Sequence, residues 1–431
     1  MPLLNLPDVT VIAVEELPTG MRIVVETEHP PATCQQCMDL TAKIVKFGVR
    51  KRNIMDLPIR AKHVGLLVRQ KRYKCYSCGK TFMEHLGFVS ETRNMTKRLV
   101  HHVEKQAASK KSFAATAAET GLLEKTVRDV LEEFYTSTIS KMRFEVPEVL
   151  GLDELHLQGK ARAIITNTLQ GTIIAMLEDA NKKTVADFLR TLDASKIKCI
   201  NTDMCLRYKD AIYEVMPGVD VVSDKAHVLF KVGKCVDAFR IAYVKGLEKG
   251  QRTGLKKVRH VMRQRGHKLS EKDMAILETW NEHHPLLWHG YAAKEDFYAI
   301  YNAPNLAEAE RRFDAWAAGL SEELLPHFSE LIDTISRWRK EVFNHFIYWT
   351  TNAAAESLNA RIRDIDDAGK SLSFRMLRMK VLYTEGRHKL VAPKYDKSAF
   401  SMSKYHPGMD RPLNYGASIS TLVALLDKGE F

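Results

Sequence analysis

Four cysteines, placed as two Cys-x-x-Cys pairs, constrain the fold of this chain more than any other feature of its 431 residues. The first pair is Cys34 with Cys37, and the second is Cys75 with Cys78. Two such pairs offer four thiolates to one tetrahedral zinc ion, and disulfides are rare in intracellular proteins. We therefore predict one structural zinc ion, whose four sulfur ligands leave no open position for catalysis. The other cysteines stand in apolar surroundings typical of core residues: Cys199, Cys205 and Cys235.

The segment between the two pairs predicts a zinc ribbon built from strands. Residues Val64–Lys74 alternate roughly between apolar and polar side chains and lead directly into the second pair. Positive charge is concentrated around this ribbon. The net charge of the chain is +12, and Thr41–Lys111 holds 18 lysines and arginines against four acids. Such a block suits the neutralisation of DNA phosphates, although a solvated basic face is the alternative. Five candidate DNA-binding residues lie in this block: Lys51, Arg52, Arg69, Lys71 and Arg72.

After the ribbon the pattern becomes helical. A short amphipathic helix is predicted at Thr96–Ala107, and two more helices at Ser112–Tyr135 with Gly121 as the turn between them. A glycine turn between two short helices is typical of a helix-turn-helix, although helical hairpins of other kinds share it. We expect Glu124 to begin the recognition helix. Its candidate DNA-binding side chains are Lys125, Thr126 and Arg128.

From Glu148 onward, strands and helices alternate. The predicted strands are Val149–His156, Ala161–Thr168, Thr172–Leu177, Lys196–Asn201 and Val219–Val222, with helices at Thr184–Leu192, capped by Asn181, and at Tyr208–Val215. Three antiparallel strands followed by helix, strand, helix and strand is the order of the ribonuclease-H-like fold. The sequence therefore predicts an α/β core from about Val149 to Asp224.

Two aspartates in this core are candidate ligands of divalent metal ions. Asp153 lies in the middle of the first strand, where a carboxylate is costly to bury unless it is paired or binds metal. Asp203 directly follows the fourth strand, at the end where open α/β sheets bind ligands. Aspartates on neighbouring strands can bridge the two magnesium ions used in phosphoryl transfer. An ordinary acid at the end of a strand is the alternative for each.

These motifs together resemble the insertion-sequence transposases of the ISL3 family, which belong to the DDE group. The resemblance runs from about residue 3 to residue 390. It is carried by Leu3-Leu-Asn-Leu-Pro, the cysteine pairs with Asp56-Leu-Pro between them, Gly151-Leu-Asp-Glu, Thr202-Asp-Met, Ser223-Asp-Lys-Ala-His-Val, Arg337-Trp-Arg and Thr351-Asn-Ala-Ala-Ala-Glu-Ser-Leu-Asn. The resemblance implies that Asp153 and Asp203 are the first two catalytic acids and Glu356 the third. It also implies two magnesium or manganese ions, and a homodimer that holds both ends of the element.

The residues around Glu356 are compatible with that role. Asn352 and Asn359 share one face of a predicted helix with Glu356 and would line a polar pocket. Because Asp203 and Glu356 are 153 positions apart, an insertion must interrupt the core. Ala238–Phe346 reads as that insertion and is nearly all helical. Its tryptophans are expected in the core rather than as platforms for bases: Trp280, Trp288, Trp316 and Trp338.

Two residues after the fifth strand have competing interpretations. Asp224 and His227 form an Asp-x-x-His motif at the start of a helix. A simple helix-capping role is favoured for Asp224. His227 is a candidate catalytic residue that could approach the metal ions or the scissile phosphate, with a structural histidine as the alternative. Further on, a basic helical stretch could contact DNA or be merely solvated: Arg361, Arg363, Lys370, Arg375, Arg378 and Lys380.

The sequence thus predicts a multidomain α/β protein. We expect a zinc ribbon at 1–90, a helix-turn-helix at 91–145, a ribonuclease-H-like core at 146–237 and 347–392, a helical insertion at 238–346 and a C-terminal segment at 393–431. No stretch approaches the ~18 consecutive apolar residues of a membrane span, and no signal peptide is evident, so a soluble intracellular protein is expected. The resemblance to insertion-sequence transposases implies a bacterial cytoplasmic protein associated with the nucleoid.

The expected function is that of a DNA transposase. It would bind terminal inverted repeats and target DNA as double strands, cleave a strand with metal ions, and transfer it. The alternative is a regulator that binds DNA, has no enzymatic activity and keeps a decayed nuclease domain.

Overall fold

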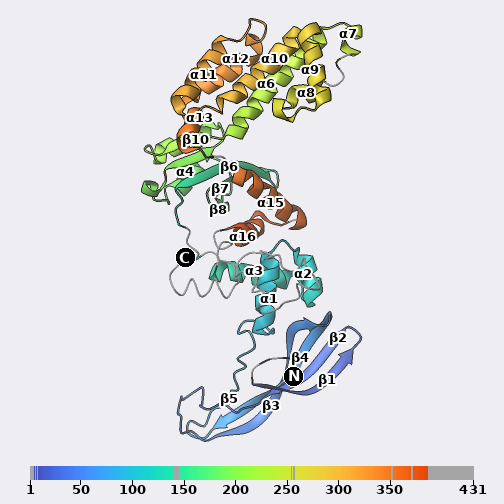
Figure 1. Ribbon diagram of the computed structural model, residues 1–431. Coiled ribbons are helices and arrows are strands. Elements are labelled where there is room, and N and C mark those ends of the chain that lie inside the picture. Colours follow the sequence, from blue (N-terminus) through green and yellow to red (C-terminus); the bar gives the residue numbers. More distant parts are fainter. Residues whose placement is uncertain are drawn as a thin grey trace. The chain divides into compact units, whose positions relative to one another are not determined.

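The computed structural model describes residues 4, 6, 8–138, 141, 145–253, 255, 258–350, 353–369 and 372–386. The chain divides into two compact units, which are described separately (Figure 1). The first unit contains the described residues up to position 141 together with those from Ile362 onward. The second unit spans Glu145–Arg361.

A sheet of five strands begins the first unit. Its strands are β1 (Val9–Leu17), β2 (Gly20–Thr27), β3 (Ile44–Ile59), β4 (Lys62–Cys75) and β5 (Thr81–Met83). The order is β1-β2-β4-β3, and β5 pairs with β4. Alternation places Val64, Leu66 and Val68 on the buried face of β4, each at most 1% exposed. The predicted strand Val64–Lys74 therefore forms, two residues longer at its start and one at its end.

Helices complete the first unit. They are α1 (Lys97–Ala108), α2 (Phe113–Thr120), α3 (Glu124–Ser137) and α16 (Phe374–Glu385). Thr96 caps α1 through its side chain, and Ser112 caps α2. Gly121 ends α2 with a φ of 73°, and a Cβ there would lie 2.9 Å from the ring of His63 on β4. Glycine is therefore required at this turn for two reasons. It adopts a positive φ without strain, and it has no Cβ that would collide with His63.

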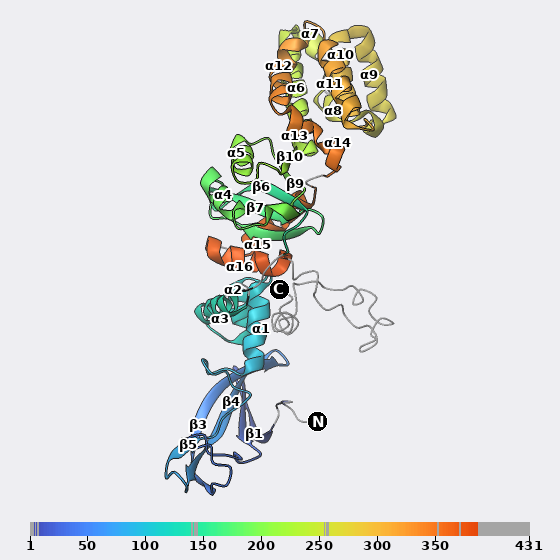
Figure 2. The same ribbon diagram turned by 90° about the vertical axis from the view of Figure 1, so that its left-hand side faces the viewer.

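The second unit is built on a mixed sheet of five strands. They are β6 (Val149–Leu157), β7 (Lys160–Asn167), β8 (Thr172–Met176), β9 (Cys199–Thr202) and β10 (Asp220–Ser223), in the order β10-β9-β6-β7-β8. β6, β7 and β8 are antiparallel neighbours, whereas β9 and β10 run parallel to β6. Helices α4 (Lys182–Leu189) and α5 (Leu206–Val215) pack beside this sheet (Figure 2).

These elements lie within three residues of the predicted ones. The one local difference concerns Asn181. It stands at the N-cap of α4, but its side chain makes no cap hydrogen bond. Its backbone N–H instead donates to the carboxylate of Asp179, 2.9 Å away. The predicted capping role of Asn181 was therefore wrong.

A helical bundle follows β10 in the second unit. Helix α6 (Lys225–Gly246) starts directly after Asp224, so position 238, the expected start of the insertion, lies inside it. The other helices up to residue 350 are α7 (Lys249–Thr253), α8 (Val258–Arg263), α9 (Glu271–His283), α10 (Pro285–Ile300), α11 (Leu306–Ala318), α12 (Leu325–Arg337), α13 (Arg339–Phe343) and α14 (His345–Tyr348). Trp280, Trp316 and Trp338 are 2 to 8% exposed in the bundle core, and Trp288 packs against that core partly buried. They are therefore core residues, as expected.

The chain returns from the bundle to the sheet along its β10 edge. Asn344 donates a hydrogen bond of 2.9 Å to the carbonyl of Val221, and Tyr348 donates one of 2.7 Å to Asp220. Helix α15 (Ala353–Gly369) follows. This return brings a helix from late in the chain back to a sheet whose strands lie 130 residues or more earlier.

Candidate metal centres

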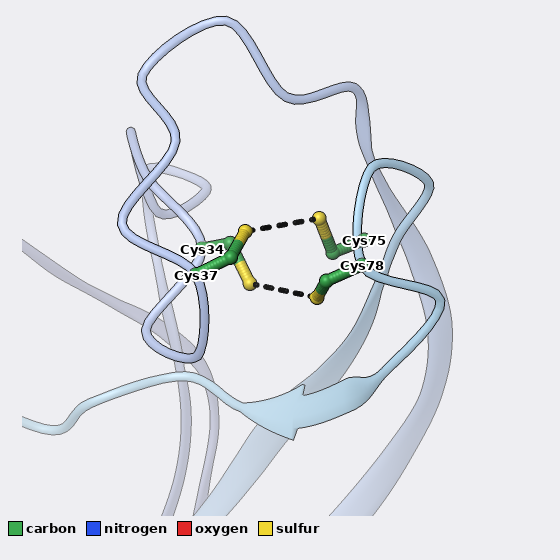
Figure 3. A group of neighbouring side chains, drawn as sticks. All are labelled: Cys34, Cys37, Cys75 and Cys78. Atoms are coloured by element: carbon green, nitrogen blue, oxygen red, sulfur yellow. Dashed lines mark hydrogen bonds between the residues drawn. The ribbon is translucent and has the colours of Figure 1, made fainter.

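The four cysteines predicted to bind zinc meet in one cluster. Cys34 and Cys37 approach Cys75 and Cys78 from two loops (Figure 3). All four Sγ atoms lie within 4.8 Å of one another, and the cross pairs Cys34–Cys78 and Cys37–Cys75 are 3.8 Å apart. Four sulfurs about 2.3 Å from a tetrahedral zinc ion would lie about 3.8 Å from each other. The donor set and its spacing therefore fit one structural zinc ion.

The loops around this cluster have the conformation of zinc knuckles. The backbone N–H of Gln36 points at Cys34 Sγ, 3.4 Å away, which favours a thiolate there. In the second loop Gly79 has a φ of 72°, and its N–H donates to the carbonyl of Cys75. Gly79 thus makes a left-handed turn, which glycine adopts without a steric penalty.

Asp153 and Asp203 come from adjacent strands of the second unit. Asp153 lies in β6 and is 6% exposed, and Asp203 follows the last residue of β9, the parallel neighbour of β6. Burial raises the pKa of Asp153, and the negative charge of Asp203 raises it further. The backbone N–H of Glu154 and the amide of Asn359 work in the opposite direction by donating hydrogen bonds to the Asp153 carboxylate. Asp203 therefore lies close enough to Asp153 for its charge to act on that carboxyl group.

Glu154 points away from this site, as the alternation of a strand demands. Its carboxylate receives hydrogen bonds from Arg207, at 2.6 Å, and from the hydroxyl of Tyr208, at 3.2 Å. These partners belong to α5. Of the two neighbouring acids in β6, only Asp153 faces the candidate metal site.

His227 links Asp203 to a third acid, Asp224. Its Nδ1 atom lies 2.8 Å from Asp203 Oδ1 and 3.0 Å from Asp224 Oδ2. Contacts with Asp203 and Asp224 raise the pKa of His227 to about 10. The three side chains also form a group whose donor atoms lie close enough together to hold one metal ion.

This group corrects the interpretation of Asp224. Asp224 stands at the N-cap of α6, but its side chain makes no cap hydrogen bond. It is 4% exposed and accepts a hydrogen bond from His227 instead. The Asp-x-x-His spacing was a signal for this arrangement, because residues three apart share one face of a helical turn.

The donor atoms at this end of the sheet fit divalent ions. Asn359 Oδ1 is buried and has no hydrogen-bond donor among the described residues. Asp203 Oδ1 is also buried, and it lies 2.8 Å from His227 Nδ1. A buried oxygen without a donor is costly, and carboxylate and carbonyl oxygens are the ligands that magnesium and manganese prefer.

Glu356 lies one helical turn from this centre without touching it. It is exposed and stands in the first turn of α15. Asn359, three residues later, donates a hydrogen bond of 2.5 Å to Asp153. Within the described residues, no hydrogen bond or ion pair joins Glu356 to Asp153 or Asp203. Asn352, the other predicted amide, lies outside the described residues.

The predicted DNA-binding residues of the first sheet differ in their surroundings. Lys51 and Arg69 face each other across β3 and β4, and both are exposed. Arg52 is held by two hydrogen bonds to Asn94, and Lys71 donates one of 2.6 Å to the carbonyl of Thr27. Arg72 lies over the exposed ring of Phe47. Lys51 and Arg69 are therefore the pair most available to a ligand.

In the helical part of the first unit, α3 begins at Glu124, where the recognition helix was expected to start. Lys125 is exposed and Thr126 is partly buried. Arg128 pairs with Glu124 at 2.5 Å, one turn earlier. Lys380 contradicts its expected place on a basic surface, because it is 1% exposed and inaccessible to DNA. Lys370 lies outside the described residues.

Comparison with known proteins gives concordant results. A family model for ISL3 transposases, described as transposase, matches residues 150–378, which is more than half of the chain. A second model, described as the zinc-finger of transposase IS204/IS1001/IS1096/IS1165, matches residues 30–78. The transposase for insertion sequence element IS1001 of Bordetella parapertussis is 24% identical over 214 residues, 48% of this chain and 52% of that protein. The chain thus matches about half the length of this curated relative.

Among the described residues, no helix has both the length and the apolar character that a membrane crossing would need. The two family models cover the cysteine cluster and the acidic centre separately. With its zinc ribbon, its mixed α/β architecture and these matches, the chain belongs to the ISL3 family of insertion-sequence transposases.

Proposed function

We propose that this chain binds the terminal inverted repeats of an insertion sequence and catalyses metal-dependent DNA cleavage followed by strand transfer into target DNA. The observation that carries the proposal is the meeting of Asp153 and Asp203 on adjacent strands, where burial and mutual repulsion raise the pKa of Asp153. A buried acid whose pKa is raised, beside a second acid at the end of an α/β sheet, is typical of catalytic sites.

The topology of the second sheet supports a ribonuclease-H-like core. Its three antiparallel strands, followed by two strands parallel to β6, have the order that this fold requires. The helical bundle between Asp203 and Glu356 would be the insertion, and α15 would return to the core. In this arrangement Asp153, Asp203 and Glu356 form a DDE triad.

Two magnesium or manganese ions at this triad would activate the attacking oxygen and stabilise the leaving oxygen of the scissile phosphate. Asp153 and Asp203 are already close, and Asn359 holds the Asp153 carboxylate in place. Glu356, on the same face of α15 as Asn359, would complete the ligand set. His227 positions the Asp203 carboxylate relative to α6. Water, and then the 3′ hydroxyl of DNA, would serve as nucleophiles, so the protein's task is to position charge.

DNA recognition falls to the first unit in this proposal. Lys51 and Arg69, exposed side by side on the ribbon, would bind phosphates. Helices α2 and α3 would form a helix-turn-helix around Gly121, with Lys125 and Thr126 directed at the DNA. Two copies of the chain would hold the two ends of the element, acting on DNA in the bacterial cytoplasm.

A cleavage assay with zinc-loaded protein and a duplex that carries the element's end tests the proposal. Asp153→Asn and Asp203→Asn should each lower the rate of magnesium-dependent nicking by at least about 100-fold, since each removes a charge that holds the metal. Both variants should keep their affinity for the end. Glu154→Gln is the matched control, because it neutralises the neighbouring acid on the opposite face of β6. Binding without nicking in both magnesium and manganese would instead support a regulator without enzymatic activity.

A further inference from the structure

Helix α6 has two apolar faces, and only one of them is buried. Val228, Val232 and Val236 point into the core of the bundle, each at most 2% exposed. On another side of the helix, Phe230 is 61% exposed and Ile241 is 56% exposed. Scattered apolar residues on a surface are common, but a large aromatic ring on a helix that is already packed is a candidate contact for a ligand.

This second face lines a cavity of about 620 Å³ between α6, α8 and α10. These three helices lie side by side in both views of the molecule (Figures 1 and 2). Phe230 and Tyr298 contribute aromatic rings to the lining. A cation lies over each ring, with Lys234 Nζ 4.7 Å from the centre of Phe230 and the Arg265 guanidinium 4.5 Å from that of Tyr298. Aromatic rings beside cations are the surface on which nucleobases stack.

The wall of the cavity is fixed from within by a buried lysine. Lys294 is 1% exposed, and its Nζ donates hydrogen bonds to the carbonyls of Met262 and Gln264. It thereby ties the end of α8 to α10. The cavity is consequently preformed, so a ligand would not have to order its walls on binding.

A basic depression adjoins the apolar cavity. It is lined by Arg259, His260, Arg263 and Gln264, and Arg263 lines both hollows. The only acid among the residues that line the two hollows is Asp237, which is neutralised by ion pairs with Arg240 and Arg263. The cavity offers an apolar surface with aromatic rings, and the depression beside it is positively charged. This pair of surfaces is complementary to a nucleobase and its neighbouring phosphate.

The apolar cavity and the basic depression together form one groove, which starts near the acidic centre. Phe230 follows His227 by three residues, which is about 5 Å along the axis of α6, and His227 contacts Asp203. We propose that the groove between α6, α8 and α10 binds an unpaired nucleobase of a DNA strand next to the cleavage site, with the adjoining phosphate at Arg263. This inference rests on the proposed function, which identifies the bound strand as the DNA that is cleaved.

Nucleic acid suits the groove better than a second copy of this chain. The exposed side chains at its rim include Lys234, Arg259 and Arg263. A symmetric contact between two copies would bring these like charges together and remove them from water, which is costly. A strand of DNA would instead supply one negative charge per nucleotide.

Binding of a single-stranded probe tests the inference. The full chain, loaded with zinc and kept free of magnesium, is titrated into a labelled 12-nucleotide thymidine strand and into a duplex of the same length, and fluorescence anisotropy is measured. Phe230→Ala should weaken binding of the single strand about tenfold, which is the lower range for loss of one stacked base. Its affinity for the duplex should not change.

Two further variants sharpen this test. Phe230→Trp should bind the strand as the natural chain does, and its added fluorescence should be quenched when a base stacks on it. Met274→Ala is the matched control, because it removes a side chain of α9, 48% exposed, that does not line the groove. It should leave both affinities unchanged.

Equal affinities of the Phe230→Ala variant and the natural chain for the single strand would overturn the inference, and so would a parallel loss for strand and duplex. Dissociation of an oligomer by Phe230→Ala, with strand binding intact, would assign the groove to a second copy instead. Because no cleavage occurs without magnesium, failure of this test is separate from failure of the proposed function. Loss of nicking in Asp203→Asn, with no effect of Phe230→Ala on strand binding, would support the proposed enzymatic function. It would contradict only the binding of a nucleobase in the groove.

Discussion

Asp56 connects the first sheet to the helices that follow it. It is completely buried and accepts hydrogen bonds from Thr96, at 2.7 Å, and from two nitrogens of Arg98. Arg98 also donates to the carbonyl of Leu4. Asp56 and Leu4 both lie in motifs that carried the resemblance to ISL3 transposases. Their role in the structure is to hold the fold of the first unit.

Replacing Asp56 should therefore destabilise the first unit. Asp56→Ala leaves Arg98 and Thr96 without their acceptor and should lower the free energy of unfolding by roughly 3 kcal/mol. Asp56→Asn keeps one acceptor oxygen and should cost roughly half as much. Chemical denaturation followed by circular dichroism measures both. Glu16→Ala, which removes an exposed ion pair with Lys62, is the control and should change stability by less than about 1 kcal/mol. Equal losses in all three variants would refute this role of Asp56.

Lys380 is the most unusual charged residue of the first unit. Its Nζ donates hydrogen bonds of 2.9 Å to the carbonyls of Ser109 and Lys111, and the ring of Phe113 lies 4.5 Å away. A neutral amine has two N–H groups, and both are satisfied here. Burial lowers the pKa of Lys380 to about 7.

This shift predicts how stability depends on pH. An unfolded lysine has a pKa of about 10.4, so between that value and the folded one the unfolded chain binds a proton that the folded chain does not. The resulting destabilisation is complete below about pH 7 and disappears as the pH rises toward 10. Relative to Lys380→Met, the natural chain should therefore gain stability with rising pH, by at most about 1.4 kcal/mol per pH unit.

Urea denaturation of both proteins between pH 6.5 and 9.5 measures this difference. Arg375→Met, on the same helix but 62% exposed, is the control and should show no such slope relative to the natural chain. A constant difference between Lys380→Met and the natural chain over this range would show that Lys380 stays charged in the fold.

At the residue scale, spacing and strand position were enough to predict some of the candidate sites. The spacing of the four cysteines is enough to predict a zinc site. Asp153 and Asp203 stand at recognisable places, one within a predicted strand and one directly after another. Lys380 could not be placed, because its burial depends on packing between helices that lie 260 residues or more apart in sequence. Asp224 was misassigned because a helix-capping aspartate and a histidine-bound one have the same local sequence.

At the scale of single elements, the zinc ribbon joins the ends of β3 and β4 to the loop that follows β2. We expect one zinc ion per chain, measured by inductively coupled plasma mass spectrometry. Cys75→Ser should abolish this stoichiometry and lower the thermal stability of the first unit, since a structural zinc ion contributes to folding. Cys205→Ser is the matched control, because Cys205 stands at the N-cap of α5, where serine is favoured. Zinc retained in Cys75→Ser would contradict a site made of four cysteines.

Element types were predictable because their periodicities differ. The alternation of β4 and the helical spacing around Gly121 are local properties of the sequence. The boundary expected at residue 238 falls inside α6, since the helix continues from the sheet into the bundle without a turn. The exposed apolar face of α6 was also hidden in the sequence, because a helix with two apolar faces has no clear amphipathic pattern.

At the scale of the whole molecule, the second unit brings residues together that are far apart in sequence. Asn359 reaches Asp153 across 206 positions. Only the resemblance to a family pointed to α15 as a partner of the first strands, because no periodicity or spacing reports contacts of that range.

A crystal of the chain with a DNA end and manganese, measured for anomalous scattering at the manganese edge, tests whether the three acids form one metal site. We expect two peaks about 3.5–4 Å apart, both in contact with Asp153 or Asp203 and with Glu356 as a further ligand. A single peak held only by Asp203, Asp224 and His227, with Glu356 directed to solvent, would contradict this expectation.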